Sequence, residues 1–143
     1  MADRTLVYFV SDVHLGLDVN DPADREARFV SFLKSIPKDR AKSLYLLGDI
    51  WDFWYEYHDV VPKGYVRVFA ALMDLMDAGV EVCFFQGNHD IWCFHYFEEM
   101  GIRILRQPYI QPSPSLHRVP FRQGVVQEEQ GGEESGICIQ GHR

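Results

Sequence analysis

The sequence predicts an α/β domain with a mostly parallel sheet and flanking helices, and three observations lead to this prediction. Short apolar runs alternate along the chain with longer stretches in which apolar residues recur every three to four positions. The runs are continuously apolar, which is typical of strands buried on both faces of a sheet. A polar loop follows each of the first three runs. This alternation predicts parallel strands covered by helices.

The expected strands span residues 6–10, 43–47, 80–85 and 102–105. The expected helices span residues 22–36, 64–78 and 91–100. Asp21 is placed to cap the first helix, Pro22 suits its first position, and Pro37 ends it. Gly79 and Gly101 stand where the second and third helices should end, since glycine readily adopts the left-handed conformation of a helix C-terminus.

Composition restricts the classes of function. The 143-residue chain suits one domain, and a hydrophobic content of 47% is enough for an ordinary core. A net charge of −7 argues against general nucleic-acid binding but is compatible with a metal enzyme, because bound cations reverse the local sign of the field. The three cysteines form no closed disulfide set, and no run is long enough to span a membrane. We therefore expect a cytoplasmic protein.

The character of the chain changes near residue 107. Residues 1–107 carry the regular pattern and are expected to form an N-terminal half-domain, whereas residues 108–143 are rich in proline and glycine and are expected to be irregular and poorly ordered. Two explanations of this segment stay open: a natural flexible tail, or a truncated or shifted reading frame that replaces a lost second half.

Polar clusters follow three of the expected strands. Asp12 and His14 come after the first strand, Asp49 and Asp52 after the second, and the sequence from Gly87 to Asp90 after the third. Sites in parallel α/β sheets form outside the carboxyl ends of the strands, so these clusters are expected to meet along one edge. Carboxylate, imidazole and amide oxygen are ligands for manganese, iron or zinc. The pattern predicts a metal site.

The sequences SDVHLG, GDIWDFW and GNHD resemble the first three signature blocks of the calcineurin-like metallophosphoesterases. The resemblance implies a partial fold of that family, the front half of an α/β/β/α sandwich. It also implies two divalent cations, with manganese favoured. The implied metal ligands are Asp12, His14, Asp49 and Asn88, with Asp49 shared between the two cations. His89 is the implied catalytic histidine, with Asp90 orienting its ring.

Within the family, the aromatic sequence from Gly48 to Trp54 resembles UDP-2,3-diacylglucosamine hydrolases of lipid A synthesis. That resemblance implies hydrolysis of a pyrophosphate by a metal-activated hydroxide. It also implies a phosphorylated small-molecule or glycolipid substrate, peripheral membrane contact through that substrate, and no nucleic-acid partner. Many members carry arginine where His89 stands, which leaves the substrate open. The resemblance covers about residues 5–107 and then fails. The alternative hypothesis is therefore a non-catalytic fragment of such an enzyme with an incomplete metal site. A third hypothesis is a regulatory protein that binds phosphate in the same pocket.

Other residues near these blocks have competing explanations. Asp52 is equally suited to orienting a ligand and to capping its loop. The aromatic residues of this loop suit either the core or an apolar wall beside the substrate: Trp51, Phe53, Trp54, Tyr55 and Tyr57. His58 and His95 match no block and are not expected to be ligands. Cys93 is expected to be a buried, unreactive thiol.

Overall fold

The computed structural model describes residues 3–106, 109–111 and 137–139. Four parallel strands form one sheet in the order β1-β2-β3-β4. The strands are β1 (Leu6–Val10), β2 (Ala41–Leu46), β3 (Glu81–Phe85) and β4 (Arg103–Leu105). The predicted α/β class and the parallel sheet are confirmed, and each strand agrees with its expected range to within two residues.

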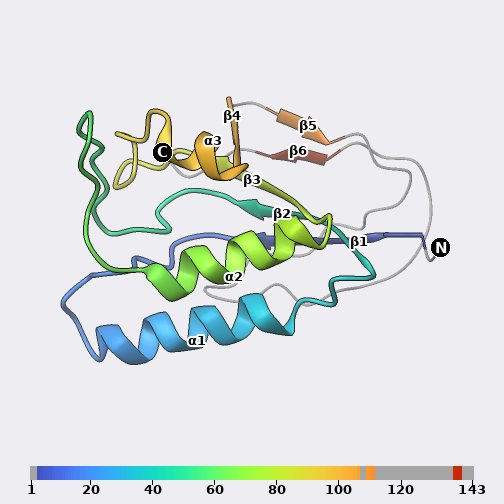
Figure 1. Ribbon diagram of the computed structural model, residues 1–143, viewed down its shortest axis with the longest axis horizontal. Helices are drawn as coiled ribbons and strands as arrows, with labels where there is room; N and C mark the ends of the chain where they lie inside the picture. Colours follow the sequence, from blue (N-terminus) through green and yellow to red (C-terminus); the bar gives the residue numbers. More distant parts are fainter. Residues whose placement is uncertain (1–2, 107–108, 112–136, 140–143) are drawn as a thin grey trace.

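Two long helices lie side by side against one face of the sheet (Figure 1). They are α1 (Pro22–Ser35) and α2 (Val66–Asp77). The first is capped as predicted, because the Asp21 side chain accepts a hydrogen bond from the backbone of Asp24 at 3.0 Å. The second begins after Tyr65, which has a positive φ and makes no side-chain capping bond.

Side chains alternate between the two faces of the sheet. Leu44, Leu46 and Phe84 belong to the main core shared with the helices, together with Leu33 and Leu72. A second, smaller cluster comes from the intervening positions of the strands: Tyr45, Leu47, Cys83, Phe85 and Leu105. Both faces of the sheet are therefore apolar, as the continuous apolar runs predicted.

The third helix is shorter than predicted. α3 comprises only Tyr96–Met100, whereas residues 91–100 were expected to be helical. Trp92 instead forms a parallel bridge with Tyr55. The carboxylate of Glu56 accepts the backbone N–H groups at the start of α3. Hydrogen bonds to a distant loop thus override the local helical pattern before Tyr96.

In the segment after residue 107, two short strands are described. β5 (Tyr109–Gln111) and β6 (Ile137–Ile139) pair in antiparallel fashion, and neither was predicted. The remaining residues of 108–143 lie outside the described part of the chain. Within that part, no helix combines the length and hydropathy of a membrane span.

Candidate metal centre

The first two polar loops lie side by side beyond the ends of β1 and β2. The N–H of Asp12 donates to the carbonyl of Gly48 at 3.2 Å, and the N–H of His14 donates to the carbonyl of Asp49 at 3.0 Å. These backbone bonds extend the parallel pairing past the strands themselves. They bring the side chains of Asp12, His14 and Asp49 to one edge of the sheet, as expected.

Three of the four predicted metal ligands form a compact group. Asp12, His14 and Asp49 each offer a ligand atom, and these atoms all lie within 4.8 Å of one another. Asp49 is nearly fully buried at 2% exposure. Oxygen and nitrogen donors at this spacing fit a divalent cation of the hard or borderline class. The donor set therefore fits the first of the two expected cations.

All three of these residues have backbone conformations that non-glycine residues rarely adopt. The φ angles are +54° at Asp12, +50° at His14 and +51° at Asp49. Each such conformation costs about 1 kcal/mol and persists only where surrounding contacts enforce it. The hydrogen bonds between the two loops hold these residues in the strained conformation. The strain therefore occurs at the same residues whose side chains could hold a cation.

Asn88, the fourth predicted ligand, is exposed and lies in the loop after β3. This loop approaches Asp49 closely, because the N–H of His89 donates to Oδ1 of Asp49 at 3.0 Å. Gly87 makes the approach possible: a Cβ at that position would collide with the Asp49 carboxylate. The third loop therefore meets the first two at Asp49, the ligand that the family resemblance assigns to both cations.

His89 lies beside His14, and both side chains are partly exposed. The ring centroids are 4.9 Å apart with the planes at 90°. The Nδ1 of His89 lies 2.9 Å from the carbonyl oxygen of Asp52, and the side chain is 41% exposed. This hydrogen bond is the main cause that raises the pKa of His89 above its ordinary value, and the carboxylates of Asp49, Asp52 and Asp90 act in the same direction.

The predicted orienting role of Asp90 is not what the geometry shows. Asp90 is completely buried, and its carboxylate accepts the backbone N–H groups of four residues. These donors are Gly87 at 2.8 Å, Asp49 at 3.1 Å, Ile50 at 2.8 Å and Trp51 at 3.3 Å. Asp90 therefore joins the second and third loops, while Asp52 contacts the His89 ring. Burial raises the pKa of Asp90, and the four hydrogen bonds oppose that shift.

Asp52 contacts both histidines. Its Oδ1 lies 3.2 Å from Nδ1 of His14, which leaves Nε2 of His14 facing Asp12 at 3.7 Å. A carboxylate bonded to one ring nitrogen fixes the other for a metal. Of the two roles left open for Asp52, the geometry favours orientation of a ligand.

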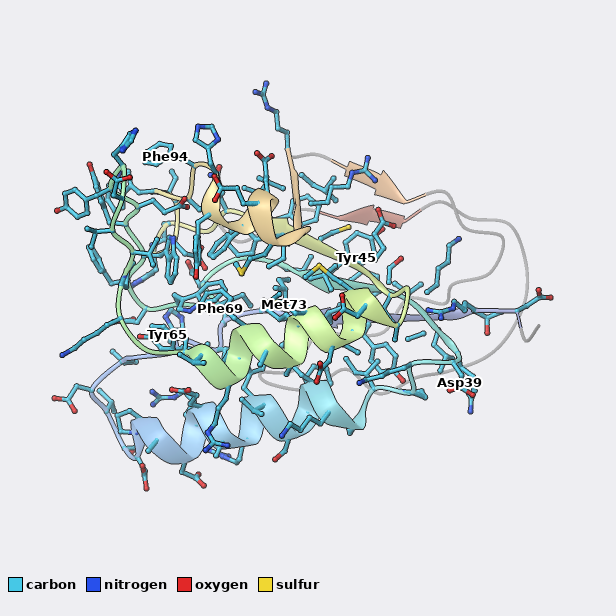
Figure 2. The ribbon with its side chains drawn as sticks, in the orientation of Figure 1. Asp39, Tyr45, Tyr65, Phe69, Met73 and Phe94 are labelled. Atoms are coloured by element: carbon cyan, nitrogen blue, oxygen red, sulfur yellow. The ribbon has the colours of Figure 1, made fainter. Side chains whose placement is uncertain are left out.

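The aromatic loop divides between core and surface. Trp51 and Trp54 are fully buried, each with its ring centroid 4.9 Å from that of Phe97, so both belong to the core. Phe53 and Tyr57 are 60% and 67% exposed. Figure 2 shows Phe69 between α2 and the strands and Phe94 at the outer edge of the loops. An apolar wall beside the site can therefore involve only part of the residues first considered.

The structure also gives the positions of the remaining candidates. His58 is exposed and pairs with Asp59, and His95 is exposed at the start of α3. Neither belongs to a group of potential metal ligands among the described residues. Cys93 is 3% exposed, and burial raises the pKa of its thiol to about 12.

Two further contributors were not anticipated from the sequence. Arg25 on α1 donates to the carbonyls of Leu17 at 2.8 Å and Val19 at 2.6 Å, which anchors the loop after His14. Glu56, only 6% exposed, accepts hydrogen bonds from Trp54 and from the start of α3. The Arg25 partners lie only six and eight positions earlier in the chain, but no spacing motif singles them out, whereas the Glu56 partners at the start of α3 lie about 40 positions away.

A parallel α/β sheet with carboxylates and imidazoles gathered at its strand ends is an arrangement that could hold divalent cations. The model of the calcineurin-like phosphoesterase family matches residues 5–143, and the chain belongs to that family. The signature blocks predicted this membership.

Similar proteins include several named UDP-2,3-diacylglucosamine hydrolase. The relative from Porphyromonas gingivalis is 42% identical over 103 residues, covering 71% of this chain and 39% of the relative. The relative from Proteus mirabilis is 38% identical over 100 residues, covering 69% and 40%. The relative from Nitrosococcus oceani is 34% identical over 104 residues, covering 72% and 40%. The matched region thus spans about two fifths of each relative's length.

Among solved structures, the nuclease MPE of Pseudomonas putida is similar with a TM-score of 0.49 and 18% identity, covering 78% of this chain and 56% of the nuclease.

Proposed function

We propose that this chain carries the front half of a two-metal site that hydrolyses a phosphoester or pyrophosphate, with UDP-2,3-diacylglucosamine as the substrate. One observation carries the proposal: ligand atoms of Asp12, His14 and Asp49 lie within 4.8 Å of one another, with the His89 ring next to that of His14. Family membership and the names of the relatives support it.

In this proposal each residue has a defined task. Asp12, His14 and Asp49 hold the first cation, and Asp49 with Asn88 contributes to the second. Bound cations would supply an acidic water and neutralise charge on the phosphate oxygens. His89 contacts the phosphate and donates a proton or hydrogen bond to the departing oxygen. In the metal-free chain, the hydrogen bond from Nδ1 to the carbonyl of Asp52 raises the pKa of the His89 ring, which favours the doubly protonated form that could donate through Nε2.

Manganese is the proposed metal, with iron and zinc as alternatives, because the oxygen and imidazole donors suit all three. The glycolipid substrate is proposed from the relatives' names. Exposed Phe53 and Tyr57, in the same loop as Asp52, offer apolar surface for its acyl part and for peripheral contact with a membrane. A cytoplasmic location is also proposed, and the odd number of cysteines supports a reducing compartment.

A second candidate is a metal-binding chain without turnover. One observation favours it: three described side chains, Asp12, His14 and Asp49, are assigned to the first cation, but only Asp49 and Asn88 to the second. Water can complete the coordination, but with lower affinity. Residues 1–107 would then be half of a phosphoesterase domain.

The experiment measures release of UMP from UDP-2,3-diacylglucosamine by the purified chain, with and without manganese. Manganese-dependent release that disappears in Asp49→Ala supports the hydrolase. Manganese binding by calorimetry without release supports the non-catalytic candidate. The hydrolase proposal fails if release is absent at saturating manganese or if Asp49→Ala leaves it unchanged. Asp39→Asn is the matched control, since Asp39 lies at the opposite end of the sheet (Figure 2).

A further inference from the structure

Glu56 is a buried carboxylate outside the group of metal ligands. Its Oε1 accepts from the backbone of His95 at 3.0 Å and of Tyr96 at 2.7 Å. Its Oε2 accepts from the backbone of Phe94 at 2.7 Å and from the indole of Trp54 at 3.3 Å. Burying a carboxylate is costly unless it is fully hydrogen bonded, and these four donors offset that cost.

The same residue ends a series of hydrogen bonds between the second and third loops. The Nδ1 of His89 meets the carbonyl of Asp52 at 2.9 Å, and the N–H of Trp54 donates to the carbonyl of His89 at 3.3 Å. The N–H of Glu56 then donates to the carbonyl of Trp92 at 3.0 Å. The two loops therefore run side by side from His89, at the site, to the Glu56 carboxylate.

The third loop has no regular structure of its own between the site and α3. Apart from the contacts described above, Gln86 supports it by donating to the carbonyls of Ile91 and Cys93, both at 3.1 Å. Since α3 has only five residues, it is too short to be stable alone. Glu56 therefore fixes the far end of the loop whose near end carries Asn88 and His89.

We propose that Glu56 is a positioning residue for the phosphoesterase site: by holding residues 94–96, it keeps the third loop in register with the second and sets where the His89 ring lies. The catalytic part of this role rests on the proposed function. The structural part does not, because it concerns hydrogen bonds within the chain. The Glu56 carboxylate itself contacts neither His14 nor His89, so it acts on the site only through the third loop.

The charge of Glu56 provides a sharp test, because glutamine has nearly the same shape but the wrong hydrogen bonding. In Glu56→Gln the amide nitrogen would face at least one N–H donor, so two donors would oppose each other. Glu99→Gln is the matched control, since Glu99 is exposed on α3 and its change removes the same charge.

The experiment uses NMR on the full chain. In the wild type, hydrogen exchange at Trp54 and at residues 94–96 should show similar protection, as expected for one cooperative unit. In Glu56→Gln, protection should fall at least about tenfold at both places. At about pH 9, where histidine is ordinarily neutral, the wild-type His89 ring should carry its proton on Nδ1, and Glu56→Gln should shift it toward Nε2.

Turnover provides the second readout. If the wild-type chain releases UMP, Glu56→Gln should lower kcat on the order of 100-fold with a smaller change in KM, since misplacing a catalytic group costs about that much. Absence of turnover in the wild type would count against the proposed function only, because exchange and tautomer would still report on Glu56.

A different pattern would overturn the role of Glu56. If the loss of protection in Glu56→Gln stayed within residues 94–100 and the His89 tautomer did not change, Glu56 would merely cap α3. If the glutamine variant does not fold, hydrogen exchange and the His89 tautomer are measured on Glu56→Asp instead. This variant keeps the charge, but its side chain is one methylene shorter, and the same two patterns support or overturn the role of Glu56. Independent opening of Trp54 and residues 94–96 in the wild type would also overturn it.

Discussion

The backbone carbonyl oxygen of Asp52 lies 2.9 Å from Nδ1 of His89. Only a protonated Nδ1 can donate to a carbonyl, so this contact selects the tautomer of the neutral ring and leaves Nε2 free. The orienting role expected for the neighbouring Asp90 thus falls to a residue 37 positions earlier in the chain. Because the contact uses the backbone, substitutions at position 52 test the carboxylate separately.

We expect Asp52→Asn to weaken binding of the first cation about tenfold, a typical effect of losing a carboxylate behind a ligating histidine. The Asp52 carboxylate lies 3.2 Å from Nδ1 of His14, whereas its carbonyl contact to His89 survives the substitution. Manganese affinity is measured by calorimetry. Asp59→Asn removes an exposed carboxylate from the same loop and should leave the affinity unchanged. Equal affinities in the wild type and Asp52→Asn would contradict the orienting role.

Gly87→Ala is expected to damage the site through crowding. The added methyl group would collide with the carboxylate and backbone of Asp49, so the second and third loops must separate. We expect manganese affinity to fall about tenfold or more, given how strongly metal sites depend on the groups that position their ligands. Gly64→Ala is the control, because that position has open space around it and suffers only from its positive φ. A site that binds manganese normally in Gly87→Ala would show that the close approach is not required.

Asp90→Asn is expected to destabilise the fold by about 3 kcal/mol, because a buried carboxylate that accepts four N–H groups is replaced by a group with one acceptor and an opposing donor. Chemical denaturation without metal measures the change in the free energy of unfolding. Asp39→Asn, an exposed change of the same type, should stay within about 0.5 kcal/mol of the wild type. A loss below about 1 kcal/mol for Asp90→Asn would mean that backbone relaxation or water replaces the lost acceptors.

The elements with strong local signals were predictable from the sequence. Asp21 and Pro22 define the start of α1, and the continuous apolar runs correspond to the four parallel strands. The predicted ligands Asp12, His14 and Asp49 come shortly after β1 or β2, and the parallel pairing of these strands, continued by the backbone bonds of the loops, brings them together. Their grouping within 4.8 Å is therefore a consequence of topology.

The contacts that complete the site were not predictable in this way. Asp90 bonds to the backbone of residues about 40 positions away, and Glu56 bonds to the start of α3 across a similar separation. Neither partner is specified by spacing, because a carboxylate can accept a hydrogen bond from any buried N–H. The late start of α3 has the same origin: residues 91–95 have a helical pattern, but the backbone groups of Trp92, Phe94 and His95 bond to Glu56.

The raised pKa of His89 predicts how the stability of the metal-free chain depends on pH. The folded chain binds the His89 proton more tightly than the unfolded chain, chiefly through the hydrogen bond to the Asp52 carbonyl. His89 therefore contributes stability below its unfolded pKa, and this contribution is lost as pH rises through the folded pKa. With a chelator present, the stability difference between the wild type and His89→Gln should be larger at about pH 5.5 than at about pH 8.5. NMR titration of the ring should give a midpoint above that of the urea-unfolded chain. A midpoint equal to or below the unfolded value would mean that burial outweighs the hydrogen bond, and the pH dependence of stability would then vanish or reverse.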